Sequence, residues 1–397
     1  MIENMKPLSI TGYSLVNACG IGHAATLNAI KHNQTGLNRQ AYRDLTLPTW
    51  LGKVSGVDEH RLDESLANFD CRNNRLANMA LAIDDIGDQI HQVIDQYGAD
   101  RIGVFVGTST SGIEETEKVY EKLAVKHADI ATQYDFLATH NLASLLVFIQ
   151  KRLGISGVGQ TISTACSSSA KVFAAAHRHI HAGLCDAAIV GGVDSLCNTT
   201  LYGFDSLQLI SDDICRPYDA HRKGINIGEA AGFVILERVN NARGKVKLKG
   251  YGESSDAYHM SSPHPDGKGA VIAMREALMR AGLAADEINY INLHGTGTQN
   301  NDMSEGRGIY QVFGDRVNCS STKGYVGHTL GAAGITEAII SIMALESGVV
   351  PGNINLHNVD KDIPVQPLLT SKKMALGNVV SNNFGFGGSN CSLIFGW

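Results

Sequence analysis

Short runs of β-branched and aliphatic residues alternate along this chain with longer stretches that have a helical pattern. The runs lie at residues 101–110, 158–164, 185–195 and 289–299. Strands that are separated by helices, and that are apolar on both faces, are typical of a sheet covered by helices on each side. The pattern therefore predicts an α/β fold. Since no low-complexity linker divides the sequence, we expect its parts to pack tightly together.

The same order of motifs occurs twice along the chain. LSITGYSLVNACG (8–20) resembles VKLKGYGESSDA (246–257), and RIGVFVGTSTSG resembles NYINLHGTGTQN. In the same order, VGQTISTACSSSAKVFAAAHRHI resembles VNCSSTKGYVGHTLGAAGITEAII (317–340). An internal repeat of this kind indicates a duplicated structural unit. We therefore expect two similar α/β halves, residues 1–243 and 244–397, related by a pseudo-twofold axis.

The duplication places Cys166 and His328 at equivalent junctions between a strand and a helix. The helix after each junction is rich in Ala and Gly. Two such junctions, related by a pseudo-twofold axis, would direct both helix N-termini towards one centre. We therefore expect the thiol and the imidazole to meet, although about 160 residues separate them in the sequence.

Composition narrows the classes of function. With 44% hydrophobic residues, a net charge of −6 and no basic block, the chain can bury a large core but offers no surface for nucleic acid. The N-terminus lacks the pattern of a signal peptide, and no uncharged apolar stretch approaches the roughly 18 residues that span a bilayer. The eight cysteines are scattered without a CxxC pair, as in reduced proteins. These features predict a cytoplasmic protein without a membrane span.

One cysteine, Cys166, lies where a β-branched run ends and an Ala-rich helix begins, in TISTACSSSAK. A thiol at a helix N-terminus is close to the positive end of the helix dipole, which favours the nucleophilic thiolate. The other seven cysteines have no such setting, and we interpret them as small buried apolar residues. Ser167, Ser168 and Ser169 are weaker candidates for a nucleophile, because the chain has no GxSxG motif at this place.

Two histidines further along the chain complete the candidate chemistry. His294, in INLHGTGTQNND, follows a predicted strand and so lies at its carboxyl end, where α/β folds build sites; the alternative is a histidine that caps a turn. His328, in STKGYVGHTLGAAG, opens a helix whose N-terminus disfavours the imidazolium, so the ring stays a neutral hydrogen-bond donor. Lys323 is either an ordinary surface charge or a cation that orients an acid such as Glu305.

Other motifs carry weaker signals. His177 and His181 have the spacing of a metal pair on one helix face, but with no carboxylate at matching spacing a solvated helix end is the better interpretation. No GxGxxG follows the first strand and no GxxxxGK[ST] occurs, so a nucleotide cofactor is not expected. SNNFGFGGSN (381–390) surrounds Phe384 and Phe386 with glycines, which indicates backbone that approaches a ligand, or a hinge.

The segments TACSSS, LHGTGTxxxD, STKGYVGHTLGAAG and NNFGFGGSN together resemble the elongating β-ketoacyl-[acyl-carrier-protein] synthases, types I and II, of the thiolase-like superfamily. The likeness runs from the first strand to the last, and RPYDAHRKGINIGEAAG (216–232) also matches the family's central segment. The resemblance implies a five-layer α-β-α-β-α fold made of two similar halves, usually as a dimer.

The resemblance also implies a Cys-His-His triad of Cys166, His294 and His328. Lys323 matches the family's lysine between the two histidines, and Glu305 matches the acid that this lysine orients. In such enzymes the cysteine takes an acyl chain, and the histidines stabilise the enolate that forms when a malonyl group loses CO₂. No metal or redox cofactor is implied, because the acyl and malonyl groups arrive on the phosphopantetheine of an acyl carrier protein.

Further residues match the family's substrate contacts. Thr296 and Thr298 match hydroxyls that hold the pantetheine arm. Phe384 matches the gating phenylalanine, whose backbone N–H joins that of Cys166 in an oxyanion hole. In similar enzymes the stretch at Thr110 comes from the partner subunit and floors the acyl pocket, often with Gly or Ile. A threonine there implies tolerance of extended, stiff or polar-tipped chains such as polyenes.

Related classes differ at these same residues. Starter-type condensing enzymes and chalcone-type synthases resemble a Cys-His-Asn set, whereas residue 328 is histidine here. Thiolases carry a second catalytic cysteine in a C-terminal glycine-rich loop, and NNFGFGGSN has none. Chain-length-factor subunits share the fold as non-catalytic scaffolds but lack the nucleophile, so Cys166 argues against that alternative.

Departures from the family pattern bear on the pathway. Gly297 and Gln299 stand where many housekeeping members have Ser and Pro, and TACSSSAK replaces a more common Ala-Thr pair. We interpret these departures as favouring aryl-polyene or type II polyketide synthesis, with housekeeping fatty-acid synthesis as the alternative. The expected partners are an acyl carrier protein and a second subunit, which is either an identical copy or a chain-length-factor-like paralogue.

Overall fold

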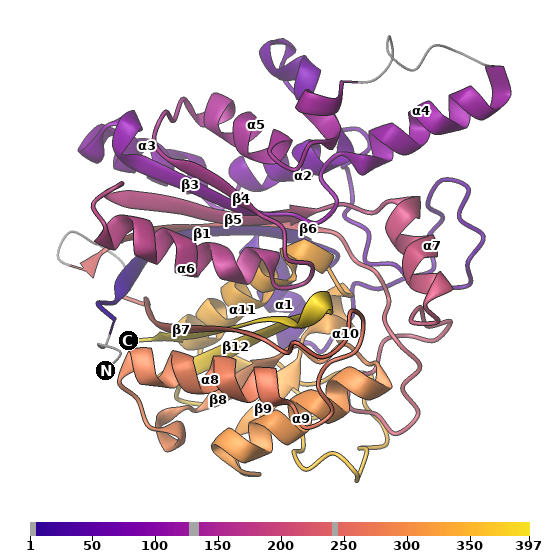
Figure 1. Ribbon diagram of the computed structural model, residues 1–397, viewed down its shortest axis with the longest axis vertical. Helices are drawn as coiled ribbons and strands as arrows, with labels where there is room; N and C mark the ends of the chain where they lie inside the picture. Colours follow the sequence, from indigo (N-terminus) through magenta and orange to yellow (C-terminus); the bar gives the residue numbers. More distant parts are fainter. Residues whose placement is uncertain (1–4, 127–134, 240–244) are drawn as a thin grey trace.

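The computed structural model describes residues 5–126, 135–239 and 245–397, in which helices and strands stack in layers (Figure 1). Among these residues, eleven strands form one mixed sheet, ordered β4-β3-β5-β6-β1-β7-β13-β12-β8-β9 with β2 beside β1. Its strands are β1 (Leu8–Asn17), β2 (Gly20–Ile21), β3 (Ile102–Gly107), β4 (Gly159–Ile162), β5 (Ala187–Asp194), β6 (Ala230–Arg238), β7 (Lys247–Ser255), β8 (Tyr290–Leu293), β9 (Asn318–Ser321), β12 (Asn378–Gly385) and β13 (Ser389–Gly396). A separate short pair is formed by β10 (Val349–Val350) and β11 (Lys372–Lys373).

The strand order is the same when read from either end of the sheet. From one edge it runs β4-β3-β5-β6-β1, and from the other β9-β8-β12-β13-β7, so each strand of the first set has a counterpart in the second. The pairings also agree: β3 is parallel to its two neighbours, as β8 is to its own, and β6 and β13 are each antiparallel to theirs. This symmetry supports the proposed division into two halves. The proposed boundary between residues 243 and 244 lies outside the described residues.

The helices form three layers, one on each outer face and one between the two halves of the sheet (Figure 1). One outer layer holds α2, α3 and α5 on the first half, and the other holds α8 on β7 and β13 with α9 beside it. Helices α6 and α11 lie between the halves and contact strands of both. The helices are α1 (His23–Lys31), α2 (Arg72–Leu81), α3 (Ile86–Tyr97), α4 (Ile113–Lys126), α5 (Ser144–Leu153), α6 (Ser168–His181), α7 (Asn198–Ser206), α8 (Lys268–Ala281), α9 (Gln299–Phe313), α10 (Lys323–Val326) and α11 (Ala333–Ser347). The five-layer α-β-α-β-α arrangement implied by the resemblance is therefore the observed fold.

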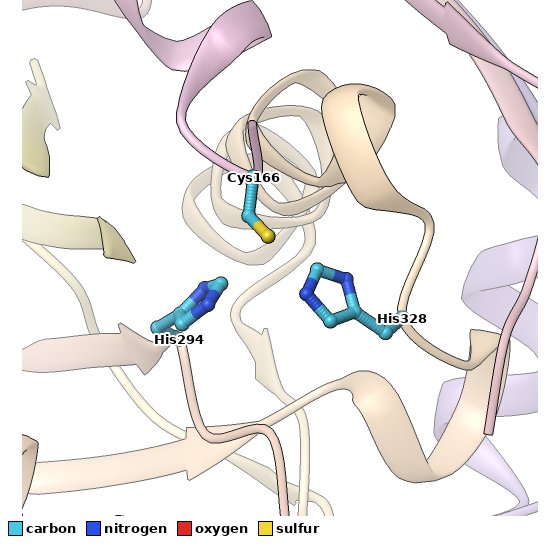
Figure 2. Close-up of side chains that lie close together, drawn as sticks. All are labelled: Cys166, His294 and His328. Carbon is cyan, nitrogen blue, oxygen red and sulfur yellow. The ribbon is translucent and has the colours of Figure 1, made fainter. Parts of the chain in front are cut away.

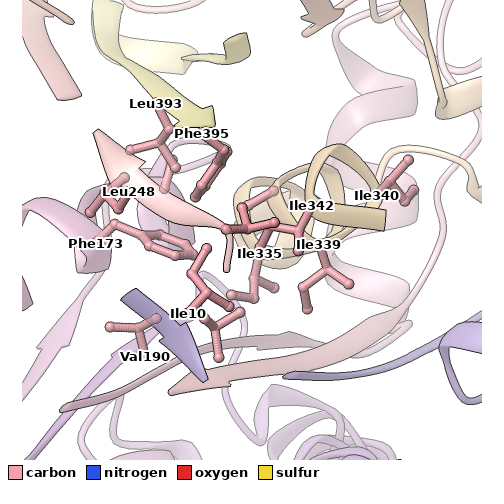
Figure 3. Close-up of a cluster of buried hydrophobic side chains, with 14 of the residues drawn as sticks. Ile10, Phe173, Val190, Leu248, Ile335, Ile339, Ile340, Ile342, Leu393 and Phe395 are labelled. Carbon is pink, nitrogen blue, oxygen red and sulfur yellow. The ribbon is translucent and has the colours of Figure 1, made fainter. Parts of the chain in front are cut away.

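The central layer is the core of the molecule. Helix α11 is buried without interruption from Ala333 to Leu345, which is the pattern of a helix that is apolar on all sides because both of its faces meet protein. In Figure 3, isoleucines of this helix face a cluster that includes Phe173 of α6 and Phe395 of β13. The rings of Phe173 and Phe395 pack edge to face with centroids 5.7 Å apart. This core fixes the N-terminal ends of α6 and α11, which Cys166 and His328 precede in the chain.

One segment, Leu330–Ser347, is long and apolar enough by composition to cross a membrane. It includes Glu337, so it is not an uncharged stretch. Because 89% of the segment is buried inside the protein, it is the core helix of the central layer.

Candidate active site

The backbone holds Cys166 at a sharp junction between β4 and α6. Ala165, the residue before it, has a φ of +51°, a left-handed conformation that costs a non-glycine residue about 1–2 kcal/mol. The Ser168 hydroxyl stabilises the junction, because it accepts a hydrogen bond from the Thr164 N–H (2.9 Å) and donates one to the Ala165 carbonyl (2.5 Å). The Ser167 hydroxyl donates to the Thr164 carbonyl (2.9 Å). These two serines therefore support the position of the cysteine.

The structure brings Cys166, His294 and His328 together. The sulfur of Cys166 and one nitrogen of each imidazole ring lie within 4.8 Å of one another, and all three residues are buried. Figure 2 shows the sulfur pointing between the two rings, whose centroids are 5.4 Å apart and whose planes are nearly perpendicular. Cys166 comes from the first half of the chain and the histidines from the second, so the site lies where the two halves meet.

Each histidine has its Nδ1 occupied by a donor. The Lys323 ammonium donates to Nδ1 of His294 (3.3 Å), and the Leu330 N–H donates to Nδ1 of His328 (3.2 Å). Since Nδ1 is the acceptor in both rings, the ring proton of each neutral histidine is on Nε2. Burial, together with the charge of Lys323, lowers the pKa of both histidines well below its usual value. Both rings are therefore neutral and present an Nε2–H donor.

Burial also determines the pKa of the Cys166 thiol, and it raises this pKa, whereas the helix dipole was expected to lower it. Burial raises the pKa of the Cys166 thiol to about 11, although the nearby Lys323 charge and the backbone N–H of Phe386 lower it. The thiol is only 4% exposed, so removal of water from the thiolate outweighs the charges that favour it. In the free enzyme this cysteine is consequently a protonated thiol at neutral pH.

Lys323 does not pair with Glu305, so this part of the prediction is corrected. Its ammonium is fully buried and forms an ion pair with Glu337 of α11, while also donating to the carbonyl of His294. The other carboxylate oxygen of Glu337 accepts from the side-chain amide of Asn383. No sequence motif points to Glu337, because it lies one helix further on and meets Lys323 only through the packing of the central layer.

Glu305 has a different place in the site. Its carboxylate accepts hydrogen bonds from the backbone N–H groups of His294 and Gly295, both at 2.7 Å. Burial raises the pKa of Glu305 to about 7. Glu305 thus fixes the backbone that carries His294, and it does so without an ion pair to Lys323.

The prediction about Phe384 is corrected in the same way. Phe384 belongs to the β12–β13 ladder, opposite Asn390, and its ring lies 6.2 Å from that of His294. The N–H that points to the Cys166 thiol is that of Phe386, two residues later, where the strand has given way to a turn. Phe386 is therefore the residue whose N–H, with that of Cys166, can form an oxyanion hole.

A pocket of about 330 Å³ opens onto these groups. Cys166, His294 and His328 line it, together with Thr296, Thr298 and the two phenylalanines of the glycine-rich loop. The hydroxyls of Thr296 and Thr298 are 2.9 Å apart, and that of Thr298 also caps α9 by accepting from the Asn301 N–H. Gly297, between them, has a φ of +81°, which explains a glycine at this position. The two threonines are thus placed to meet a ligand in the pocket.

Thr110 is buried but is not among the residues that line this pocket. Its hydroxyl donates to Asp194 at 2.8 Å. Whether it floors an acyl pocket shared with a partner subunit stays a prediction.

His177 and His181, which have the spacing of a metal pair, lie at the far end of α6. The Nε2 atoms of both rings form hydrogen bonds with the Lys6 carbonyl.

The fold and this constellation define a thiolase-like cysteine enzyme. Comparisons with known proteins agree. A family model described as "Beta-ketoacyl synthase, N-terminal domain" matches residues 76–242, and one described as "Beta-ketoacyl synthase, C-terminal domain" matches residues 246–357. The chain belongs to the β-ketoacyl synthase family, and it is an acyltransferase.

Relatives of known name are similar over most of the chain. The 3-oxoacyl-[acyl-carrier-protein] synthase 2 of Vibrio cholerae is 31% identical over 97% of this chain and 98% of its own length. A mitochondrial 3-oxoacyl-[acyl-carrier-protein] synthase of Arabidopsis thaliana is 39% identical, over 62% of this chain and 58% of its own length. Among solved structures, the ketosynthase ApeO of Xenorhabdus doucetiae, in complex with its chain length factor ApeC, superposes with a TM-score of 0.90 at 37% identity, and the match covers 98% of each chain.

Proposed function

We propose that this enzyme joins an acyl chain held on Cys166 to a malonyl group carried by acyl carrier protein. The products are 3-oxoacyl-[acyl-carrier-protein], CO₂ and free carrier protein. The observation that carries this proposal is the meeting of one buried thiol with two neutral Nε2–H donors in a single pocket. That set suits a reaction in which a nucleophile stores an acyl group while two donors stabilise an enolate.

In the first half-reaction, the Cys166 sulfur attacks the thioester carbonyl of the incoming acyl group. A new S–C bond forms, the bond to the carrier's pantetheine sulfur breaks, and the thiol proton ends on the departing pantetheine thiol. The N–H groups of Cys166 and Phe386 hold the oxyanion that develops on the carbonyl oxygen. Exclusion of water by the entering pantetheine arm, which meets Thr296 and Thr298, strengthens these interactions.

In the second half-reaction, His294 and His328 donate their Nε2–H groups to the thioester carbonyl of the malonyl group. Cleavage of the C–C bond to the carboxylate releases CO₂ and leaves the electron pair in the enolate, whose oxygen the two donors stabilise. The enolate carbon then attacks the acyl group on Cys166, the C–S bond breaks, and the released Cys166 thiolate takes up a proton from solvent to restore the thiol. The carrier protein's pantetheine delivers both substrates, so these steps need no metal or redox group.

For the pathway, we propose a specialised elongation such as aryl-polyene or polyketide synthesis. The likeness to ApeO over nearly the whole chain supports this, because ApeO was solved with a chain length factor. We also propose a cytoplasmic enzyme that works with an acyl carrier protein and a second subunit, which is either another copy or a chain-length-factor-like paralogue. Housekeeping fatty-acid synthesis is the second candidate, favoured by the 31% identity to the Vibrio cholerae enzyme.

The decisive experiment is intact-mass analysis after incubation with acyl-loaded carrier protein. We expect one acyl group to be added at Cys166, and we expect Cys166→Ala to add none and to lose condensation while its circular dichroism spectrum is unchanged. A wild-type protein that takes up no acyl group would indicate a scaffold subunit. An alanine variant that still elongates would mean that another group is the nucleophile. Supplying saturated and polyene primers side by side then separates the two pathways.

A further inference from the structure

Asp194, the last residue of β5, is a fully buried carboxylate that joins the loop 108–110 to the turn that follows His328. On one side it accepts from the hydroxyls of Thr108 (2.7 Å), Ser109 and Thr110 (2.8 Å), and from the backbone N–H groups of Ser109 (2.9 Å) and Thr110 (3.0 Å). On the other side it accepts from the backbone N–H of Gly331 (2.6 Å). Within the described chain no lysine or arginine forms an ion pair with it, so these donors alone stabilise its charge.

The Gly331 N–H belongs to the turn that orients His328. The N–H just before it, that of Leu330, is the donor to Nδ1 of His328. Two consecutive amides thus point one to the catalytic ring and one to Asp194. Leu330 has a φ of +52°, a strained conformation for leucine that persists only where the surroundings hold it. The carboxylate of Asp194 is one of the groups that hold it.

We propose that Asp194 is a positioning residue that keeps His328 in its donating orientation through Gly331 and Leu330. The same carboxylate ties this turn to the loop 108–110, so the two move as one unit. The inference rests on the proposed function, because it assigns Asp194 to the step in which His328 acts, the decarboxylation of the malonyl group.

The donors around Asp194 explain why a carboxylate is needed. All of them are N–H or O–H groups, and only an ionised carboxylate accepts at both of its oxygens. Oδ1 receives four of these bonds, from Thr108, Ser109 and Thr110, while Oδ2 receives the Gly331 N–H and the Ser109 hydroxyl. An asparagine would place its oxygen on the side with more donors, and its NH₂ group would then oppose the Gly331 N–H. Asp194→Asn therefore breaks the link to the His328 turn and keeps the side chain's volume.

The test separates the two half-reactions in Asp194→Asn. We expect malonyl decarboxylation, measured as CO₂ release from malonyl-[acyl-carrier-protein], to fall by about tenfold or more through misplacement of His328. Acyl transfer to Cys166, measured by intact mass, should stay within about threefold of wild type, because the Phe386 and Cys166 N–H groups are untouched. The matched control is Ser109→Ala, which removes one donor to Asp194 and leaves the Gly331 bond. It should decarboxylate at nearly the wild-type rate.

Two further measurements separate positioning from general damage to the fold. In a His328→Ala background, Asp194→Asn should cause little additional loss of decarboxylation, since both changes act through one ring. The negative charge of Asp194 also raises the pKa of Cys166. In Asp194→Asn the pH profile of Cys166 alkylation should accordingly be shifted to lower pH than in wild type. General damage to the site would expose the thiol and abolish the dependence on burial, whereas this shift shows a folded site from which one charge has been removed.

The proposal would be overturned by wild-type decarboxylation in Asp194→Asn, by equal loss of both half-reactions, or by full additivity with His328→Ala. If Asp194→Asn does not fold, Gly331→Ala decides in its place. A Cβ there would lie 2.7 Å from Asp194 Oδ2 and 2.7 Å from the Ser109 nitrogen. It would therefore push the turn at Gly331 away from the Asp194 carboxylate without changing Asp194 itself. Normal decarboxylation in that variant would overturn the proposal. If His328→Ala alone decarboxylates normally, the proposed function has failed, and this is established first.

Discussion

At the scale of single residues, the chemistry depends on which ring nitrogen of each histidine carries its proton. In His294 a buried ammonium occupies Nδ1, and in His328 a backbone N–H does so. Neither donor can accept a proton from the ring. Both rings are therefore held as Nε2–H donors before any substrate enters. The two donors can then stabilise an enolate without any rearrangement of the rings during the reaction.

This arrangement predicts different effects on the two half-reactions. His294→Ala and His328→Ala should each slow malonyl decarboxylation at least about tenfold, which corresponds to roughly 1.4 kcal/mol of barrier. Acylation of Cys166 should remain measurable in both variants. His181→Ala, at the far end of α6, is the control and should leave both steps unchanged. Loss of acylation with normal decarboxylation would mean that the roles are reversed.

The reactivity of Cys166 gives a second prediction at this scale. Because burial raises its pKa to about 11, the thiolate fraction should increase about tenfold per pH unit between pH 7 and pH 10. The rate of alkylation by iodoacetamide, after subtraction of the Cys166→Ala rate, should rise in parallel. A plateau below pH 8 would instead mean that the helix dipole and Lys323 outweigh burial.

At the scale of elements, the glycine-rich loop after β12 packs directly on the Cys166 junction. A Cβ at Gly385 would lie 3.0 Å from the Thr164 carbonyl oxygen and 3.2 Å from the Cys166 nitrogen. The strand therefore needs a residue without a side chain where it passes the nucleophile, and the Phe386 N–H that follows owes its position to this close approach.

Gly385→Ala should consequently displace the junction. We expect acylation of Cys166 to fall about tenfold or more, and stability to fall by about 1–3 kcal/mol as in other overpacked sites. Single-turnover acylation and denaturant melts measure the two effects. Gly203→Ala is a matched control, since a Cβ there has no atom within 4 Å. Normal acylation in Gly385→Ala would show that the loop yields without cost.

The sequence predicted the elements better than the contacts between them. The β-branched runs at 101–110 and 185–195 correspond to β3 and β5, and Cys166 and His328 do meet, as the internal repeat predicted. The sequence does not show where the last strand of NNFGFGGSN ends, and the Phe386 N–H is free to face Cys166 only because β12 ends at Gly385; Phe384, two residues earlier, lies within the strand. Glu337 was missed because a lone acid in an apolar helix has no partner within reach in the sequence.

At the scale of the whole molecule, the site depends on the junction between two similar halves. The strand order from each edge is the same, so α6 and α11 begin at equivalent places and meet in the central layer. One half supplies the thiol and the other supplies both imidazoles. Neither half alone holds all three residues, which explains why they lie so far apart in the sequence.

The burial of α11 on all of its sides has a consequence for how this protein unfolds on heating. Once the two halves part, a helix with a membrane-like composition is exposed to water, and we expect the exposed chains to associate faster than they refold. We expect thermal unfolding to be irreversible, with an apparent midpoint that rises with the scan rate in calorimetry. Light scattering should increase together with the loss of ellipticity. A reversible transition on a second scan would mean that the central helix stays covered. The lifetime of the active protein would then be set by its equilibrium stability and not by the rate of unfolding.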